Sequence, residues 1–419
     1  MGKTIGCEQG KGGRTTNSPP PKSGYKILSS GIDTLNLSID VEWMGSSFFN
    51  DLSKAKDLAR EEKKDVPFSI RLLQHNEEWH CVVKPNGAAG YEWLLSGKDF
   101  TFKIGAWKKP ISRPSMMVEI RSETLWRMGF KAAVETVEML IGSAGGKVVS
   151  VKPSRVDLCL DMLLPVSEWC PELIFDIVTR AEQSATYNNL KMKRLTGFDF
   201  GSGQVRARLY DKEFEIDRKS KKYWMYDIWG LKDVPDDYRI IRVEFQLRRE
   251  VLKELGVNLI CDLFEKTGGM WAYCSESWLS FRDNAGSHMD ERKVLPWWLA
   301  IQNGFTEAQG AFPLVRVKAC QVEEKQLVAQ AYGLMSALGA LQNATGETND
   351  KSVFGTVLNF VQLTGVYGKD DKQFQTDVLA KRYKYQRLRD RLRDLFVIDS
   401  PAFSLIGQTG GAQFVGVTA

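Results

Sequence analysis

The sequence predicts an α+β fold in which two related repeats precede a helical C-terminal domain. Segments that alternate strictly between apolar and polar residues indicate antiparallel strands, and amphipathic segments between them indicate helices packed on one face of each sheet. A similar order of segments returns after about 125 residues, which indicates a duplication. From about residue 290 the sequence becomes rich in Ala and Leu with helical spacing. The expected divisions are a disordered leader (1–24), a first repeat (25–150), a second repeat (151–288), a helical domain (289–403) and a flexible tail (404–419).

Matched residues at similar positions define the duplication. The pairs are Asp33 with Asp157, Glu119 with Glu244, and Gly129 with Gly256, separated by 124, 125 and 127 residues. Such even separations over a hundred residues or so favour a true repeat. The alternative is a chance likeness between two amphipathic strand-helix units.

The second repeat carries the clearest strands. Residues 155–161 place Val156, Leu158 and Leu160 on one face, and residues 171–183 then show the apolar spacing of a helix. Residues 205–212 and 241–248 alternate in the same way, with apolar residues on one face and polar ones on the other. If these strands are neighbours, one sheet surface collects the following polar residues: Arg155, Asp157, Asp161, Arg206, Arg208, Tyr210, Lys212, Arg242, Glu244, Gln246 and Arg248.

These residue types suit cleavage of a phosphodiester. Asp157, Asp161 and Glu244 offer the oxygen ligands that Mg²⁺ or Mn²⁺ prefers, and such a cation polarises a scissile phosphate. A tyrosine has an ordinary pKa of about 10, so Tyr210 needs help to act as a nucleophile. We expect nearby cations, Arg208 and Lys212 among them, to favour its phenolate. The result would be a covalent 5′-phosphotyrosine and a free 3′-hydroxyl.

A structural interpretation of the same residues stays open. A tyrosine in a strand is often a packing residue, and charges that alternate with apolar residues are usual on a solvated sheet face. The aspartates could pair with Arg155 or Arg242, and Glu244 could pair with Arg248.

The ordered motifs resemble those of the replication initiation factor family. They are S-R-V-D-L-C-L-D at 154–161, R-L-Y-D-K-E at 208–213 and I-R-V-E-F-Q-L-R at 241–248, and the resemblance covers about residues 30–285. The family includes rolling-circle initiators of plasmids and phages and relaxases of integrative elements. The resemblance implies a palm-like sheet and a nicking nucleophile at Tyr210. It also implies metal ligands at the positions of Asp157, Asp161 and Glu244, in place of the histidines of His-hydrophobe-His nickases.

The first repeat lacks an R-x-Y-x-K run and is expected not to cut DNA. Its Trp79, Trp93, Trp107, Lys108 and Lys109 would suit stacking and phosphate contact, although the tryptophans could equally be core residues. In the second repeat, further DNA contacts are expected from six basic residues: Arg206, Lys219, Lys221, Lys222, Arg242 and Arg248. A basic helix at 381–393 could bind duplex DNA or form a salt-bridged surface.

The whole-chain properties limit the setting. The net charge of +5 decides little about nucleic acid, and seven cysteines without a CxxC pair favour a reducing cytoplasm. No apolar run suggests a signal peptide or a membrane span. With no GxxxxGK[ST] run, strand separation would need a host helicase, and a homodimer is left open. The expected function is origin-specific nicking and joining in rolling-circle replication. The alternatives are a conjugative relaxase, a nuclease that uses water, and a non-catalytic DNA-binding regulator.

Overall fold

The computed structural model describes residues 24–72, 78–283, 292–306, 313–316, 331–335 and 378. The chain divides into two compact units, residues 1–316 and 317–419. Within the second unit, residues 331–335 are helical. Several expected segments lie outside the described residues. They are almost all of the leader, most of the helical domain, including the basic helix at 381–393, and the flexible tail.

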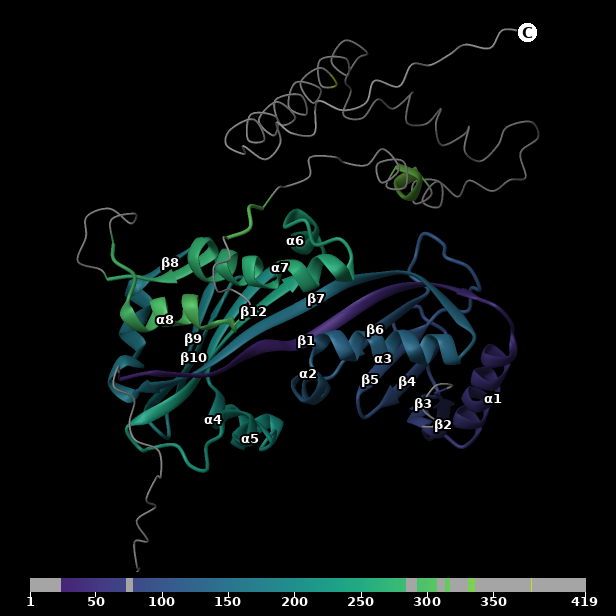
Figure 1. Cartoon of the computed structure of the whole chain (residues 1–419), viewed down its shortest axis with the longest axis horizontal. Coiled ribbons are helices and arrows are strands. Elements are labelled where there is room, and N and C mark those ends of the chain that lie inside the picture. Colours follow the sequence, from purple (N-terminus) through teal and green to yellow (C-terminus); the bar gives the residue numbers. More distant parts are fainter. Residues whose placement is uncertain are drawn as a thin grey trace, which may run out of the picture. The chain divides into compact units, whose positions relative to one another are not determined.

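One antiparallel sheet organises the first unit, and eleven strands of the described chain form it in the order β2-β3-β4-β5-β6-β1-β7-β12-β11-β10-β9 (Figure 1). The strands are β1 Lys26–Trp43, β2 Val66–Arg71, β3 Glu78–Val83, β4 Trp93–Gly97, β5 Phe100–Ile104, β6 Met116–Ile120, β7 Gly146–Pro165, β9 Ser184–Asn189, β10 Arg194–Phe200, β11 Val205–Asp211 and β12 Tyr238–Arg248.

The strand order confirms the duplication. In each repeat the first strand pairs with the last, β1 with β6 and β7 with β12, and the remaining strands follow outward as hairpins. The two repeats meet where β1 and β7 pair antiparallel over their whole length, from Lys26 opposite Leu163 to Trp43 opposite Gly146. The sheet is therefore continuous across both repeats.

Helices cover one face of this sheet, as expected. They are α1 Ser47–Glu61, α3 Phe130–Ser143, α6 Arg249–Glu254, α7 Ile260–Ala272 and α8 Pro296–Gly304. Their apolar sides join the alternate strand residues in one core, for example Val137 of α3 and Leu263 of α7 with Leu158 of β7. The predicted inward residues Val156, Leu158 and Leu160 are fully buried there.

A small cap lies on the opposite face of the second repeat. It comprises residues 212–231, with α4 Lys212–Glu215, the π-helical turn η3 Ile216–Ser220 and α5 Met225–Trp229. Figure 1 shows α4 and α5 on the other side of the sheet from α6 and α7. Ile216, Met225 and Trp229 pack with Leu163 and Ile240 in a second apolar cluster. This cap is an addition to the predicted arrangement, because it buries part of the polar face.

The predicted helix at 171–183 is wrong. The chain forms a 3₁₀ turn at Pro171–Asp176 and then β8, Ile177–Thr179, which pairs with β13, Leu279–Phe281. Three β-branched residues in succession, Ile177, Val178 and Thr179, favour an extended strand, and this preference outweighs the helical spacing of the apolar residues.

Two further findings concern the described residues alone. No helix in them is long and apolar enough to span a membrane. Cys81, Cys159, Cys170, Cys261 and Cys274 are free thiols.

Candidate active site

Three central strands bring the predicted residues onto one surface. β7, β12 and β11 are neighbours, so their polar residues form cross-strand rows. The rows are Asp157–Gln246–Arg206, Cys159–Glu244–Arg208 and Asp161–Arg242–Tyr210. The prediction that these strands pair and share a polar face is confirmed.

Tyr210 is half-buried, and its hydroxyl is held at a carboxylate. The hydroxyl donates to Glu244 Oε2 at 3.0 Å, and Lys212 Nζ lies 3.5 Å from the phenol oxygen of Tyr210. Arg208 donates to the other carboxylate oxygen, Glu244 Oε1, at 2.7 Å. Glu244 therefore bridges the phenol and a guanidinium.

The electrostatics of Tyr210 differ from the expectation that cations would favour the phenolate. Burial, and then the charge of Glu244, raises the pKa of the phenol well above its ordinary value, although Arg242 opposes the change. The guanidinium of Arg208 is directed at Glu244 and the side-chain oxygen of Gln246. The hydroxyl therefore stays protonated until a base takes its proton, and Glu244 is the base in contact with it.

Lys212 reaches the phenol because the strand ends just before it. Asp211 accepts a hydrogen bond from Phe214 N and so caps the N-terminus of α4, which turns Lys212 out of the strand alternation. Its ammonium, buried in the protein, lies over the Tyr210 ring at 5.4 Å and donates to Glu215 at 2.8 Å. Burial, followed by the charge of Arg242, lowers the pKa of Lys212.

Arg242 belongs to a buried ion-pair network. Its side chain is fully buried, donates to both oxygens of Asp161 at 2.6 and 2.7 Å, and donates to Asp33 of the first repeat at 2.8 Å. The prediction that Arg242 contacts DNA is therefore wrong, because the guanidinium is enclosed between two carboxylates. The pairing of Asp161 with Arg242, the open alternative in the sequence, is the one observed.

The three predicted metal ligands do not form one cluster. Asp161 is fully buried, and its oxygens accept from Arg242, from Trp229 at 2.8 Å and from Ser29 at 3.0 Å. Among the described residues, no group of three His, Cys, Asp or Glu side chains could hold a metal ion. Asp161 thus does not fit the predicted site.

Asp157 and Glu244 fit a cation better. Asp157 accepts from Arg155 at 2.8 Å, and burial, with a contribution from Glu244, raises its pKa to about 6 despite that arginine. Two adjacent buried carboxylates that repel each other are stabilised by a positive charge between them. Mg²⁺ is commonly held by one or two carboxylates, with water and substrate phosphate completing its shell.

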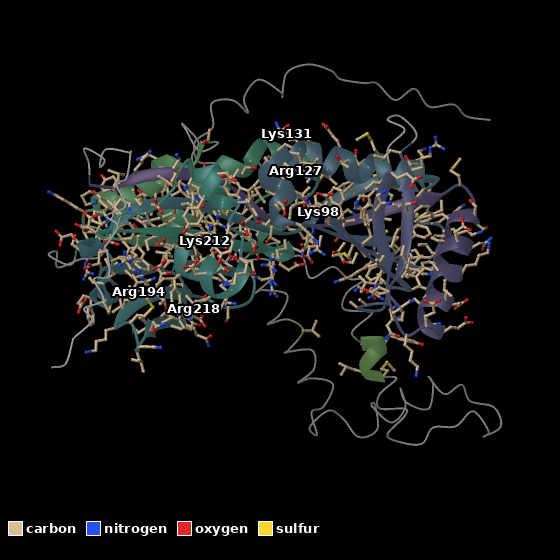
Figure 2. The ribbon with its side chains drawn as sticks, turned by 90° about the horizontal axis from the view of Figure 1, so that it is seen from below. Lys98, Arg127, Lys131, Arg194, Lys212 and Arg218 are labelled. Atoms are coloured by element: carbon tan, nitrogen blue, oxygen red, sulfur yellow. The ribbon has the colours of Figure 1, made fainter. Side chains whose placement is uncertain are left out.

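The other predicted DNA-binding residues differ in exposure and in ion pairing. Arg248, Lys219 and Lys221 are exposed, while Arg206 pairs with Asp199 at 2.7 Å and Lys222 lies 3.6 Å from Asp33. Figure 2 labels three cations of the same repeat: Arg194, Lys212 and Arg218.

The first repeat has no tyrosine at the corresponding place. Its Trp79 and Trp93 are buried in the core, and Trp107 packs against Tyr91 with ring centroids 5.7 Å apart. Trp79 and Trp93 are thus core residues, which is the alternative to DNA contact that the sequence left open. Asp33, matched to Asp157 in the repeat, instead extends the ion-pair network of Arg242.

Sequence reasoning missed three residues near the phenol. Glu215 holds Lys212, Phe214 stacks with cations, and Gly197 of β10 lies opposite Tyr210. The helical start after Asp211 was not recognised in the sequence. A glycine inside a strand was the available signal for Gly197, since it often marks a close approach.

Comparisons with known proteins give one structural likeness. No family model matches the chain, and no curated protein matches it. A solved structure described as a rolling circle replication initiator protein from Geobacillus stearothermophilus aligns with 70% of this chain and 100% of its own, at 13% identity and a TM-score of 0.39. We therefore base the functional proposal on the residues of this chain.

Proposed function

We propose that the protein nicks and rejoins one strand of DNA through a covalent 5′-phosphotyrosine at Tyr210. The supporting observation is the hydrogen bond of 3.0 Å from the phenol to Glu244, with Lys212 3.5 Å from the phenol oxygen. A packing tyrosine needs one hydrogen-bond partner. Here the hydroxyl has a base and a cation in contact with it, which is the arrangement an activated nucleophile requires.

In this proposal Glu244 acts as the general base. It takes the phenolic proton as Tyr210 attacks the phosphorus, and the new bond joins the phenol oxygen to phosphorus. The bond from phosphorus to the 3′-oxygen breaks, and the leaving 3′-oxygen takes a proton from water to become the 3′-hydroxyl. Lys212 offsets the negative charge that builds up near the phenol oxygen. The reverse reaction regenerates the phosphodiester, because the 3′-hydroxyl can attack the tyrosyl ester.

A divalent cation, Mg²⁺ or Mn²⁺, would be held by Asp157 and Glu244. When bound, it would polarise the phosphate and stabilise the charge of the leaving oxygen. Asp161 is left out of this proposal because it is fully buried and the fully buried Arg242 binds both of its oxygens. Asp157 and Glu244 pair instead with Arg155 and Arg208, which are partly exposed and would have to turn away for a cation to bind.

The chemistry suits initiation of rolling-circle replication at the origin of a plasmid, phage or other mobile element. The retained bond energy of the tyrosyl ester allows the strand to be joined again after one round of synthesis. The same chemistry would serve a conjugative relaxase, which is the second candidate. The partners would be origin DNA and a host helicase.

The test compares wild-type protein with Tyr210→Phe on a supercoiled plasmid that carries the cognate origin. In Mn²⁺ or Mg²⁺ the wild type should relax the plasmid and leave a protein-DNA adduct that resists denaturation. Tyr210→Phe keeps the ring, so it should fold and bind DNA but form neither product. Adduct formation by Tyr210→Phe at the wild-type rate would refute the assignment.

The same assay separates the alternatives. A nuclease that uses water would relax the plasmid without an adduct, and a regulator on this fold would bind DNA without cutting it. A relaxase and a replication initiator give the same products, so only the origin that is recognised distinguishes them.

A further inference from the structure

A cavity opens beside Tyr210 on the polar face of the second repeat. It encloses about 470 Å³, which lies in the range of about 300–1,000 Å³ typical of small-molecule sites. Strands β9, β10 and β11 form its floor, and η3 and α4 of the cap contribute to its wall. Residues from these elements line it, among them Tyr187, Gly197, Arg208, Phe214, Arg218 and Lys219.

A glycine lies between two tyrosines in the floor of the cavity. Gly197 of β10 is opposite Tyr210 on one side and opposite Tyr187 on the other, so the three residues form one cross-strand row. A Cβ at Gly197 would lie 2.7 Å from the carbonyl oxygen of Leu209 and 3.0 Å from Tyr210 Cβ. Gly197 therefore places no side chain between the two tyrosines, and the neighbouring strand leaves no room for one.

The walls carry aromatic surfaces beside positive charge. Tyr187 is 51% exposed, and the Phe214 ring has Arg194 at 5.1 Å and Arg218 at 5.7 Å from its centroid. Each of the three carboxylates that line the cavity is already paired, Asp199 with Arg206, Asp211 with Arg194, and Glu215 with Lys212. The exposed Arg218 and Lys219 therefore leave the cavity with surplus positive charge.

We propose that this cavity binds one unpaired nucleotide of single-stranded DNA next to the scissile phosphate. The inference rests on the proposed function of Tyr210, since it places the nucleotide adjacent to the phosphate that the tyrosine attacks. The base stacks on Tyr187, and the neighbouring phosphate lies against Arg218 and Lys219. Aromatic rings beside basic side chains are the combination that holds single strands, because every base offers a face for stacking.

Binding of a short oligothymidylate of about ten nucleotides tests this subsite, since the site sizes of single-strand binders run from about 4 to 16. Fluorescence anisotropy with the full chain measures the affinity. Tyr187→Leu should weaken binding about 5- to 150-fold, the equivalent of one lost base stack. Tyr187→Phe keeps the ring and should bind within about twofold of wild type. Arg218→Gln removes one phosphate contact. The slope of log K against log salt concentration should therefore become less steep by about 0.7.

The matched control is Phe175→Leu. Phe175 is 68% exposed and lies in the 3₁₀ turn outside the cavity, so its loss removes an aromatic surface without touching the subsite. Affinity of this variant should equal that of wild type. The subsite is wrong if Tyr187→Leu binds the oligothymidylate as tightly as wild type. It is also wrong if Tyr187→Leu and Tyr187→Phe lose the same affinity, because Tyr187→Phe keeps the ring.

The outcome is separable from the test of the nucleophile. Oligothymidylate binding requires no cleavage, so it can be measured with Tyr210→Phe as well. If Tyr187→Leu binds normally while Tyr210 still forms the adduct, the subsite is wrong and the nickase stands. To locate the base, 2-aminopurine is placed on either side of the mapped nick. Its fluorescence should be quenched at one of these two positions and recover in Tyr187→Leu, and quenching at neither position overturns the proposal.

Discussion

At the scale of residues, the three acids of the polar face have three different environments. Glu244 contacts a phenol, Asp157 contacts an arginine two residues before it, and Asp161 is enclosed by Arg242. Strand alternation predicts that all three share a face. It does not predict their partners, because Trp229 and Ser29, which complete the shell of Asp161, come from distant parts of the sequence.

Glu244 gives the first prediction at this scale. Glu244→Gln keeps the shape of the side chain but removes its basicity, so the high pKa of Tyr210 leaves the phenol protonated. Nicking should fall by about 10²- to 10⁴-fold, the usual contribution of a general base, while DNA binding changes little. Single-turnover adduct formation measures the rate.

The control for that prediction is Glu119→Gln in the first repeat. Glu119 occupies the matched position of the duplication but is exposed and has no tyrosine beside it. Its replacement should leave the adduct rate unchanged. A similar loss in both variants would show that the effect does not come from contact with Tyr210.

Asp33 gives a prediction about acid stability. Burial would raise its pKa, but Arg242, Lys222 and Lys212 outweigh burial and hold the pKa well below the ordinary value. A carboxyl with a lowered folded pKa adds stability that is present above its unfolded pKa of about 3.9 and is lost as pH falls. Wild type should therefore begin to lose free energy of unfolding below about pH 5, and the loss should continue below pH 3 because the folded pKa is so low.

Asp33→Asn should remove the part of this dependence that Asp33 contributes. At pH 7 it should be about 3 kcal/mol less stable than wild type, because the buried Arg242 loses one of its charged partners. The difference should shrink as the pH falls, which urea unfolding at several pH values measures. Asp51→Asn, with a side chain 59% exposed, is the control and should follow wild type. A constant difference at every pH would contradict the ionic role of Asp33.

At the scale of elements, the contact between β10 and β11 sets the position of Tyr210, the proposed nucleophile. Gly197→Ala should push β11 or the Tyr210 side chain aside, because the new methyl group would meet the Leu209 carbonyl oxygen at 2.7 Å. We expect destabilisation of about 1–3 kcal/mol and a loss of adduct formation larger than stability explains. Gly142→Ala in α3 is the matched control, since open space surrounds that position and alanine favours a helix. If Gly197→Ala forms the adduct at the wild-type rate, the position of Tyr210 set by β10 is not critical for the reaction, and the prediction is wrong.

Most of the central sheet could be predicted from the sequence, and its surroundings could not. Period-two alternation in residues 155–161, 205–212 and 241–248 is strong, because one face of these strands packs in the core while the other carries polar residues. The cap at 212–231 escaped prediction because its short helices depend on Asp211 capping and on packing with Leu163 and Ile240. Local sequence carries little signal for such packing, and the same limit explains why Glu215 was missed.

At the scale of the whole molecule, one continuous sheet joins the two repeats. β1 pairs with β7 from Lys26 to Trp43, and Asp33 of the first repeat pairs with Arg242 of the second. Arg242 lies in the same row as Tyr210, so the first repeat supports the strand that carries the proposed nucleophile. On the proposed function, the first repeat has a supporting role and the second repeat carries the reaction.

This dependence predicts the behaviour of the separated repeats. A fragment of residues 146–316 exposes the β7 edge, and its Arg242 keeps Asp161 but loses Asp33. Breaking a buried ion pair costs about 3–5 kcal/mol, a large share of the roughly 5–15 kcal/mol that stabilise an ordinary domain. The fragment alone should lack cooperative unfolding by circular dichroism and form no adduct with origin DNA. Mixing it with residues 24–145 should restore both, because the missing strand and carboxylate return together. If the fragment folds and nicks alone, Asp33 and β1 are dispensable, and the second repeat is an independent enzyme.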